Sequence, residues 1–301
     1  MRCGVLCSPD SWYLADLRRA SQGAHEIVAL SYRDLATRIQ GGRVEVVSTL
    51  AETGGRTTLN EFDVIVVRTM PPGSLEQVVA RMDLLGILEG QGVLVVNPPR
   101  AIEVAVDKFL ATARLAAAGL RVPRTFVCQT VAEGLAAFAA LGHDAVLKPL
   151  FGSEGRGVTR IGDRAAAQTK FRQLVEQGDV LYLQEFIDHP GFDLRVLLIG
   201  DRAISFARRN LLDWRTNLSL GGEAERRELE PDILRLAHRA AEAVGAPLAG
   251  VDLIQAPAGD WHVLEVNAVP GWKATSLELG LDIGQLVIDY LARLVQQRQH
   301  R

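Results

Sequence analysis

The sequence predicts a mixed α/β and α+β fold, in which a parallel-sheet domain comes first and antiparallel α+β units follow. In the first hundred residues, short β-like runs alternate with helical patterns, which is typical of βα units around a parallel sheet. Asn97-Pro98-Pro99 then forms a rigid turn, because neither proline can donate a hydrogen bond to a sheet. Near the C-terminus, two β-like runs between Ala249 and Val266 flank a turn sequence and predict an antiparallel hairpin.

The expected elements follow the chain in order. Strands are expected over Arg2–Cys7, Val44–Val47, Val64–Val67 and Val93–Val96, with helices over Leu14–Ala20 and Leu75–Leu88. One long helix is expected from Ile102 to Gly119, because its apolar positions keep a helical period. An α+β unit over residues 122–186 comes next. It is followed by strands over Leu194–Ile199 and Ala203–Ala207, a helix over Asp232–Ala243, the hairpin, and a last helix ending near Gln297.

Bulk composition narrows the possible classes of protein. The chain has 301 residues, a formal net charge of −3 and 23% charged residues, so nothing suggests general affinity for nucleic acid or lipid. Its apolar stretches fall short of the roughly 20 residues of a membrane span, and its first residues do not form a secretory signal. Cys3, Cys7 and Cys128 match no zinc pattern, so we expect reduced thiols in a cytoplasmic protein.

The hairpin near the C-terminus predicts a metal site. A turn centred between Ala258 and Gly259 sets Asp252 opposite Glu265, with Asn267 on the same face as Glu265. Opposed carboxylates repel unless a cation lies between them. Oxygen ligands without Cys or His favour Mg²⁺ or Mn²⁺ that bridges nucleotide phosphates. The alternative is a pair of solvated carboxylates on an exposed face. The opposite face is expected to be core, formed by Val251, Leu253, Leu264 and Val266.

A glycine-rich segment predicts a phosphate-binding loop. It runs from Lys148 to Gly157 and joins a strand ending at Lys148 to one starting near Val158. Glycines leave backbone N–H groups free to approach an anion. The segment is not a Walker A loop, because the lysine precedes the glycines and a strand follows them. We interpret it as a lid over phosphates with Lys148 beneath it; a plain hairpin loop is the alternative.

Polar residues in the second half of the chain suit an anionic substrate. Gln184 and Glu185 end an apolar run that could offer backbone groups to a purine and a carboxylate to a ribose. Asp193 and Arg195 follow at strand spacing and share a face. Further polar groups come from Arg208, Arg209, Arg215, Asn217 and Lys273. Arginines bind phosphate or carboxylate bidentately, although each could instead belong to a solvated basic edge.

Together, these segments resemble the ATP-grasp fold, specifically its RimK-like glutamate ligase branch. The resemblance covers about residues 95–290. It rests on the order and spacing of DKF (107–109), LKPLFGSEGRGV (147–158), QEFI (184–187), D-x-R (193–195), RTN (215–217) and the D…ExN set (252, 265, 267). It implies an N-terminal pre-ATP-grasp domain over residues 1–99, which ends in a Val-Asn-x-Pro turn. A central subdomain over 100–187 and a C-terminal subdomain over 188–301 would then clasp ATP.

The resemblance also implies roles for individual residues. The nucleotide would be bound by Lys108, Lys148, Gly152, Ser153, Gly155, Gly157, Gln184, Glu185, Phe186, Ile187, Asp193, Arg215, Thr216 and Asn217. The catalytic side chains would be Arg209, Arg215 and Asn217, and two metal ions would be held by Asp252, Glu265 and Asn267. In this family, an acceptor carboxylate attacks the γ-phosphoryl group of ATP, and the amine of an amino acid, often L-glutamate, displaces phosphate. A homo-oligomer is expected by analogy.

Several alternatives stay open within and outside this family. Val67–Gln77 and Asn267–Trp272 resemble enzymes that add glutamate to tetrahydromethanopterin, in which case Arg68 and the Pro71–Ser74 turn would face the acceptor; a domain-closing loop explains them equally well. The acceptor could also be a peptide C-terminus, citrate or an amino-adipate carrier. A non-catalytic nucleotide-binding protein is a rival of another class. A dinucleotide-dependent oxidoreductase is a weaker rival, since CSPDSW stands where a G-x-G-x-x-G would follow the first strand.

Overall fold

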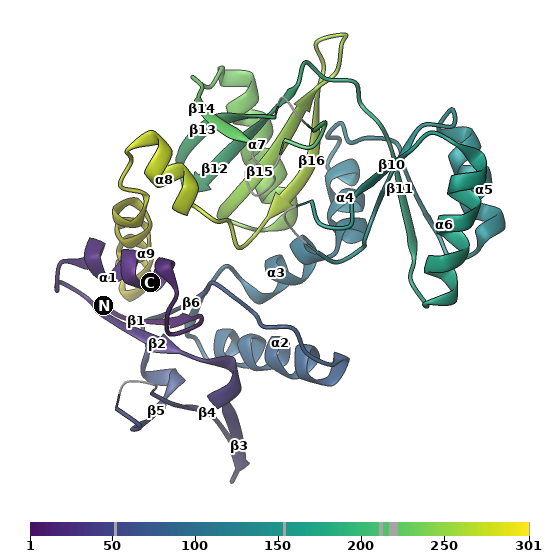
Figure 1. Ribbon diagram of the computed structural model, residues 1–301. Coiled ribbons are helices and arrows are strands. Elements are labelled where there is room, and N and C mark those ends of the chain that lie inside the picture. Colours follow the sequence, from purple (N-terminus) through teal and green to yellow (C-terminus); the bar gives the residue numbers. More distant parts are fainter. Residues whose placement is uncertain (51–52, 153–154, 211–212, 217–221, 301) are drawn as a thin grey trace.

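The computed structural model describes residues 1–50, 53–152, 155–210, 213–216 and 222–300. Within these residues the strands form four sheets, with the orders β2-β1-β6-β7, β3-β4-β5, β10-β9-β11-β8 and β14-β13-β12-β15-β16 (Figure 1). The first sheet is parallel and the other three are antiparallel. The predicted combination of α/β and α+β architecture is therefore confirmed.

The parallel sheet forms the core of the N-terminal part. Its strands are β1 (Arg2–Leu6), β2 (Glu26–Leu30), β6 (Val64–Val67) and β7 (Leu94–Val96). Helices α1 (Trp12–Ser21) and α2 (Leu75–Gly90) connect them. The chain moves from β1 outward to β2, and later from β6 outward to β7, so the direction of winding changes between β1 and β6. Strand β2 was missed by the sequence analysis.

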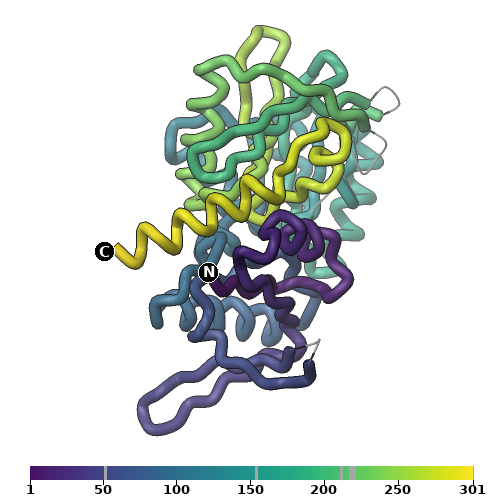
Figure 2. Tube along the Cα trace, turned by 90° about the vertical axis from the view of Figure 1, so that its left-hand side faces the viewer, coloured from purple at the N-terminus to yellow at the C-terminus, as the bar shows by residue number. Residues whose placement is uncertain are grey.

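A small antiparallel sheet corrects one prediction. The run Val44–Val47 lies in β4 (Arg43–Thr49), which pairs with β3 (Ala36–Gln40) and β5 (Arg56–Thr58) and is not part of the parallel sheet. Gly41 and Gly42 have φ of 58° and 75°, so they form the tight turn that folds β4 back on β3. Figure 2 shows this hairpin projecting from the rest of the molecule.

The predicted long helix over residues 102–119 is wrong. The structure has two helices, α3 (Pro99–Val106) and α4 (Lys108–Ala117), with Asp107 between them in an extended conformation. The Asp107 carboxylate accepts hydrogen bonds from the backbone N–H groups of Phe109 and Leu110, at 2.9 and 3.1 Å. Asp107 therefore ends one helix and caps the next, and this sets the position of Lys108 at the start of α4.

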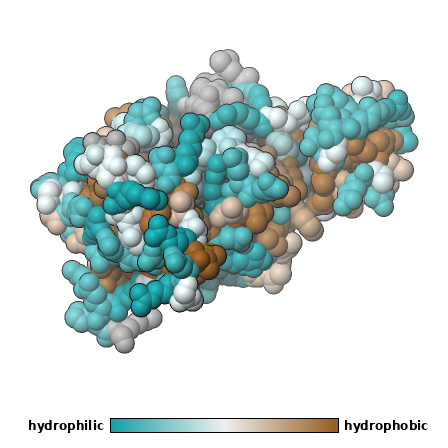
Figure 3. All heavy atoms as spheres, turned by 90° about the horizontal axis from the view of Figure 1, so that it is seen from below, coloured by the Kyte–Doolittle hydropathy of each residue, from teal (hydrophilic) through white to brown (hydrophobic). Residues whose placement is uncertain are grey.

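The sheet β10-β9-β11-β8 forms a projecting lobe. Its elements are β8 (Thr125–Cys128), α5 (Val131–Ala140), β9 (Ala145–Lys148), β10 (Thr159–Ile161), α6 (Arg164–Glu176) and β11 (Leu181–Glu185). Its own core contains Phe138 and Phe171 from the two helices and Leu181 from the sheet, each fully buried. Figure 3 shows the lobe from below, projecting from the body, with hydrophilic side chains over much of its surface.

The five-stranded sheet is the centre of the molecule. Its strands are β12 (Phe192–Ile199), β13 (Arg202–Arg209), β14 (Glu223–Arg226), β15 (Leu248–Gln255) and β16 (Trp261–Asn267). The helices of this region are α7 (Pro231–Val244), α8 (Lys273–Leu279) and α9 (Ile283–Gln299). One face packs against α3, α4 and α7. Among the described residues, no helix combines the length and the apolar character needed to cross a bilayer.

Asn97 ties the N-terminal sheet to the five-stranded sheet. Its side chain is 1% exposed and follows β7 directly. Its amide nitrogen donates to the carbonyl of Leu248, at 2.6 Å, and to that of Ala268, and its oxygen accepts from Leu248 N–H at 3.0 Å. Leu248 begins β15 and Ala268 follows β16. One buried side chain therefore holds both strands of the C-terminal hairpin at the end remote from its turn.

Asn97→Ala should destabilise the protein, because it leaves buried carbonyl and N–H groups of Leu248 and Ala268 without partners. We expect the free energy of unfolding to fall by about 3 kcal/mol, measured by urea denaturation. Asn60→Ala is the matched control. Asn60 is exposed and bonds Gln91 at 2.6 Å, so its loss should cost about 0.5 kcal/mol or less. Equal effects of the two substitutions would contradict this role of Asn97.

Candidate active site

A cleft lies between the projecting lobe and the five-stranded sheet and is lined by residues of both. The residues expected to bind nucleotide or metal that line it are Lys108, Lys148, Gly152, Gly155, Gln184, Glu185, Phe186, Ile187, Asp193, Arg215, Thr216, Asp252 and Glu265. Residues separated by more than 150 positions therefore meet at one site.

Some expected residues lie elsewhere. Gly157 has a left-handed φ of 73° and packs beside Pro149, just outside the cleft lining. The side-chain oxygen of Asn267 accepts a hydrogen bond from Val269 N–H at 2.8 Å, a local turn contact, and Asn267 does not line the cleft. Ser153 and Asn217 lie outside the described residues.

The hairpin places two acids at one end of the cleft. Asp252 pairs directly with Glu265, as the turn sequence predicts. A β-bulge then shifts the register, so that Leu253 pairs with Val263 and Leu264 is the extra residue. The prediction that Leu264 belongs to the core is therefore wrong: Val263 is fully buried in the core, whereas Leu264 lines the cleft.

Two arginines hold the Asp252 carboxylate. Arg195 Nε and Nη2 donate to its two oxygens at 2.6 and 2.7 Å, and Arg208 Nη2 lies 2.9 Å from Asp252 Oδ2. Arg208 also pairs with Asp193: its Nε donates to Oδ1 at 2.8 Å and its Nη2 donates to Oδ2. Burial by itself would raise the pKa of Asp252, but the two arginines outweigh it and hold the pKa below its ordinary value. Asp252 is therefore ionised at neutral pH.

Arg208, and not the expected Arg209, lines the cleft. Successive side chains of a strand point to opposite faces, and Arg208 is the residue of β13 that faces the cleft. Arg209 lies on the other face, with its guanidinium carbon 5.5 Å from the centre of the Phe192 ring. The sequence showed two adjacent arginines and could not decide between them without the register of β13 against β12.

Lys148 is a cation with an unusual environment. Its Nζ donates to Gln184 Oε1 at 2.5 Å, and the Gln184 amide donates to Thr125 and Tyr182 at 3.0 and 2.8 Å. Burial lowers the pKa of Lys148 to about 8, although the nearby Glu265 acts in the opposite direction. The Gln184 side chain therefore fixes the position of this lysine, while the expected purine contact would involve backbone groups of the same strand.

The start of the glycine-rich loop contacts the second lysine. Lys108 Nζ donates to the carbonyl of Gly152 at 2.6 Å. Gly152 and Gly155 have φ of 138° and 71°, values that a residue with a side chain adopts only with strain. Thus Lys108, positioned by the Asp107 cap, lines the cleft where the loop leaves β9.

Part of the cleft lining is apolar and aromatic. It contains Val146, Trp214, Ile254 and Leu264, together with His189, and none of these was predicted as a site residue. Trp214 packs edge-on against Phe186, with ring centroids 5.7 Å apart. Isolated apolar residues on four separate segments carry no recognisable spacing, so only the fold reveals them.

Two expected ligand-binding side chains already have partners. The Glu185 carboxylate accepts from Arg124 Nε at 2.6 Å and from Arg124 N–H at 2.8 Å, and Arg124 thereby holds the pKa of Glu185 below its ordinary value despite burial. Arg215 pairs with Asp213 at 2.6 Å. Both lie at the cleft wall, with orientations fixed by these ion pairs.

The cleft geometry suits a magnesium nucleotide. In the described chain, no three His, Cys, Asp or Glu side chains gather closely enough to hold a metal ion. Asp252 and Glu265 therefore form an incomplete oxygen set, which fits Mg²⁺ because that ion commonly binds one or two carboxylates and completes its shell with substrate phosphates and water. Lys148 and Lys108 lie beside these acids, as neutralising a triphosphate requires.

Comparison with known proteins identifies the family. Residues 105–291 match the RimK-like ATP-grasp domain, and residues 14–103 match the N-terminal domain of prokaryotic glutathione synthetase. The chain belongs to the RimK-like ATP-grasp family. It is accordingly an ADP-forming ligase that uses ATP.

Named relatives and solved structures agree with this family. Tetrahydromethanopterin:alpha-L-glutamate ligase of Methanosarcina acetivorans is 34% identical over 270 residues, covering 80% of this chain and 83% of its own. A probable alpha-L-glutamate ligase of Haemophilus influenzae is 33% identical over 207 residues, covering 67% and 69%. The crystal structure of a RimK domain protein from Sphaerobacter thermophilus superposes with a TM-score of 0.71 at 22% identity, covering 96% and 99% of the chains. The ATP-grasp ligase PsnB, solved with a minimal precursor, Mg and ADP, gives 0.75 at 20% identity and covers 97% of each chain.

The lowered pKa of Lys148 predicts a pH dependence of nucleotide affinity. Only the protonated amine attracts phosphate, so the affinity for Mg·ADP should fall as pH rises above about 8, by up to about tenfold per pH unit. Titration calorimetry between pH 7 and 9.5 measures this. Lys148→Arg, which stays charged, should show no such fall. An affinity of the wild type that does not change over this range would contradict the assignment.

Proposed function

We propose that this ligase joins L-glutamate to an acceptor carboxylate, and that tetrahydromethanopterin is the first acceptor to test. Three relatives at 31–35% identity are named tetrahydromethanopterin:alpha-L-glutamate ligase, which supports both substrates. The observation that carries the proposal is the pairing of Asp252 with Glu265 in a cleft that is also lined by Lys148 and Arg208. The phosphates of a nucleotide and an anionic substrate would meet beside these charges.

The reaction we propose has two steps. The acceptor carboxylate attacks the γ-phosphorus of ATP, which forms an acyl phosphate and releases ADP. The amine of glutamate then attacks the acyl carbon, and inorganic phosphate leaves with the bonding electron pair while the amine loses a proton. The described cleft residues include no serine or cysteine. Catalysis therefore rests on positioning and on charge neutralisation.

The residues of the cleft divide this work. Lys148 would bind the phosphates from the lobe and Lys108 from the start of α4. Arg208, in place of Arg209, would contribute positive charge from the sheet. Arg215, Thr216 and Asn217 would contact the transferred phosphoryl group. Gly152–Gly157 would cover the phosphates and exclude water, which otherwise hydrolyses an acyl phosphate.

The metal site would use the hairpin acids. Asp252, Glu265 and Asn267 would hold two ions, which supply the positive charge that makes γ-phosphoryl transfer possible. For Asp252 to become a ligand, it must give up part of its contact with Arg195. For Asn267 to become a ligand, its side-chain oxygen must give up the hydrogen bond that it accepts from Val269 N–H. In both cases, contacts within the protein would be replaced by contacts with the metal ion.

Further properties of the protein remain predictions. They are the domain boundaries at 1–99, 100–187 and 188–301, a homo-oligomeric state and a cytoplasmic location. Cys3, Cys7 and Cys128 are buried and free, which supports the expectation of reduced thiols. Burial raises the pKa of Cys3 to about 12, so this thiol is chemically inert.

A phosphate-release assay tests the proposed substrates. Purified protein is incubated with Mg·ATP, L-glutamate and one acceptor at a time: tetrahydromethanopterin, citrate, or a peptide with a C-terminal glutamate. We expect phosphate and ADP in equal amounts with tetrahydromethanopterin, together with a product heavier by one glutamyl residue. Phosphate release with citrate or the peptide, and none with tetrahydromethanopterin, would identify that other compound as the acceptor. No release with any of them would favour a nucleotide-binding protein without turnover.

Glu265→Gln should abolish most activity while the fold remains intact. Loss of the carboxylate removes several kcal/mol of charge stabilisation, so ADP release should fall by about a hundredfold or more. Asp260→Asn is the matched control. Asp260 is an exposed acid in the turn of the same hairpin and pairs only with Arg121 among the described residues. Full activity of Glu265→Gln, or an equal loss in Asp260→Asn, would contradict the metal assignment.

A further inference from the structure

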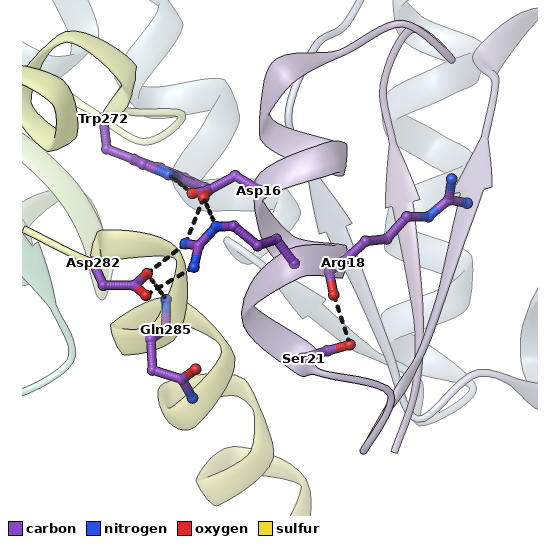
Figure 4. A network of polar contacts seen from close by, with 7 residues as sticks. Asp16, Arg18, Ser21, Trp272, Asp282 and Gln285 are labelled. Carbon is purple, nitrogen blue, oxygen red and sulfur yellow. Dashed lines mark hydrogen bonds and ion pairs between the residues drawn. The ribbon is translucent and has the colours of Figure 1, made fainter.

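A buried acid of α1 bonds to the segment that follows the metal-site hairpin. Asp16 is 7% exposed, and its Oδ2 accepts a hydrogen bond from Trp272 Nε1 at 2.9 Å (Figure 4). Trp272 is fully buried and is the last of residues 268–272, the connecting segment between β16 and α8. The hydrogen bond therefore fixes the orientation of an indole ring at the end of this segment.

The Asp16 carboxylate belongs to a network with a buried half and an exposed half. Arg19 donates to Asp16 Oδ1 from Nε and Nη2, at 3.1 and 2.7 Å, and to Asp282 from Nη1 and Nη2, at 2.9 and 2.6 Å (Figure 4). Asp282 also caps α9 by accepting from Gln285 N–H at 3.0 Å. The side chains of Arg19 and Asp282 are 55% and 49% exposed. The exposed half thus ties α1 to α9, and the buried half reaches the connecting segment through Trp272.

The structure makes room for the Asp16 carboxylate at a cost. A Cβ atom on Gly284, in the first turn of α9, would collide with this carboxylate and lie 2.8 Å from its carbon. The position thus requires glycine, although glycine is a poor helix former. Burial of a carboxylate also carries a desolvation penalty that an ion pair often only offsets, so apolar packing would stabilise this interface at least as well. Both costs indicate that the position of the Trp272 ring matters beyond its contribution to stability.

The connecting segment fits closely against the N-terminal part of the chain. The carbonyl of Pro270 accepts from Arg68 Nη2 at 2.8 Å. A Cβ atom on Gly271 would lie 2.7 Å from the hydroxyl oxygen of Tyr13, and the Tyr13 ring packs edge-on against Trp272, with ring centroids 4.8 Å apart. The segment therefore has little room to absorb a displacement of Trp272. Such a displacement would pass to the elements on either side.

Both neighbouring elements lead to the metal site. On one side, the segment continues directly from β16, the strand that bears Glu265. On the other side, Glu278 of α8 accepts from Ala224 N–H at 3.2 Å, and Ala224 pairs with Arg208 across β14 and β13. Arg208 in turn contacts Asp252 at 2.9 Å. The Trp272 ring thus lies between the supports of the two hairpin acids.

We propose that Asp16 is a positioning residue for the metal site, because through Trp272 it fixes the connecting segment and with it the spacing of Glu265 from Asp252. The inference rests on the proposed assignment of these acids as metal ligands. Mg²⁺ demands near-ideal octahedral geometry, so a small displacement of one carboxylate weakens its binding. Groups that orient metal ligands from outside the coordination shell commonly affect metal affinity for this reason.

A purely structural role for Asp16 predicts different behaviour. If the acid only held α1 against the C-terminal part, its loss would lower the thermal unfolding midpoint, and the folded protein would bind metal as before. A positioning role separates the two halves of the network. Loss of the buried half would then weaken metal binding, whereas loss of the exposed half would affect stability alone.

The test is titration calorimetry of the full-length protein with ADP, once in Mg²⁺ and once in EDTA. The ratio of the two affinities measures how strongly the protein and the nucleotide together bind the metal. We expect Mg²⁺ to strengthen ADP binding by the wild type. Asp16→Ala and Trp272→Phe should each reduce this gain about tenfold, while the affinity for ADP in EDTA stays unchanged. Trp272→Phe keeps most of the apolar volume, so it tests the proposal even if Asp16→Ala fails to fold.

Two isosteric substitutions serve as rescue and control. Asp16→Asn keeps an oxygen that can accept from Trp272 Nε1, so it should retain the gain from Mg²⁺ to within about threefold. Asp282→Asn is the matched control, because it weakens the other ion pair of Arg19 and can still cap α9. It should show the same gain as the wild type, whatever its thermal unfolding midpoint.

The outcomes separate this inference from the proposals on which it rests. Failure of the wild type to bind ADP would count against the nucleotide site. ADP binding that Mg²⁺ does not strengthen would remove the metal site, and the positioning role with it. With both sites intact, an unchanged gain in Asp16→Ala and Trp272→Phe would overturn the role of Asp16 alone. So would an equal loss of the gain in Asp282→Asn.

Discussion

The opposition of Asp252 and Glu265 on one hairpin is the constraint around which the rest of the site is built. Two carboxylates face each other because the reverse face of the same strands, with Val251, Leu253 and Val266, is fully buried. A strand cannot turn its acids outward without exposing this core, since alternate residues share a face. The repulsion must therefore be compensated at the site. Arginines do this in the protein alone, and a metal ion would do so in the reaction that we propose.

The N-terminal domain contributes to this site through two buried side chains. Asn97 fixes β15 and β16 at the end remote from their turn, and Arg68 contacts Pro270 just beyond β16. Asn97 directly follows β7 and Arg68 directly follows β6, so both lie at the edge of the parallel sheet that faces the C-terminal hairpin. The domain thus holds the acid-bearing hairpin in place, through contacts with both of its strands and with the segment that follows them.

Local sequence patterns predicted most of the fold and much of the site. The hairpin and the pairing of Asp252 with Glu265 followed from one turn, because turn position sets strand register. The errors arose where one residue changed the local geometry. The Asp107 cap divided a continuous helical pattern, and a bulge turned Leu264 toward the cleft. The aromatic and apolar cleft wall could not be predicted, because its residues meet only through tertiary contacts between the lobe and the central sheet.

A crystal structure of the protein with Mg²⁺ and a non-hydrolysable ATP analogue tests the central claim most directly. The account predicts magnesium within about 2.0–2.2 Å of carboxylate oxygens of both Asp252 and Glu265, bridging to the phosphates, with the contact between Arg195 and Asp252 loosened. Magnesium held by the phosphates alone, with Asp252 still paired as in the free protein, would contradict it.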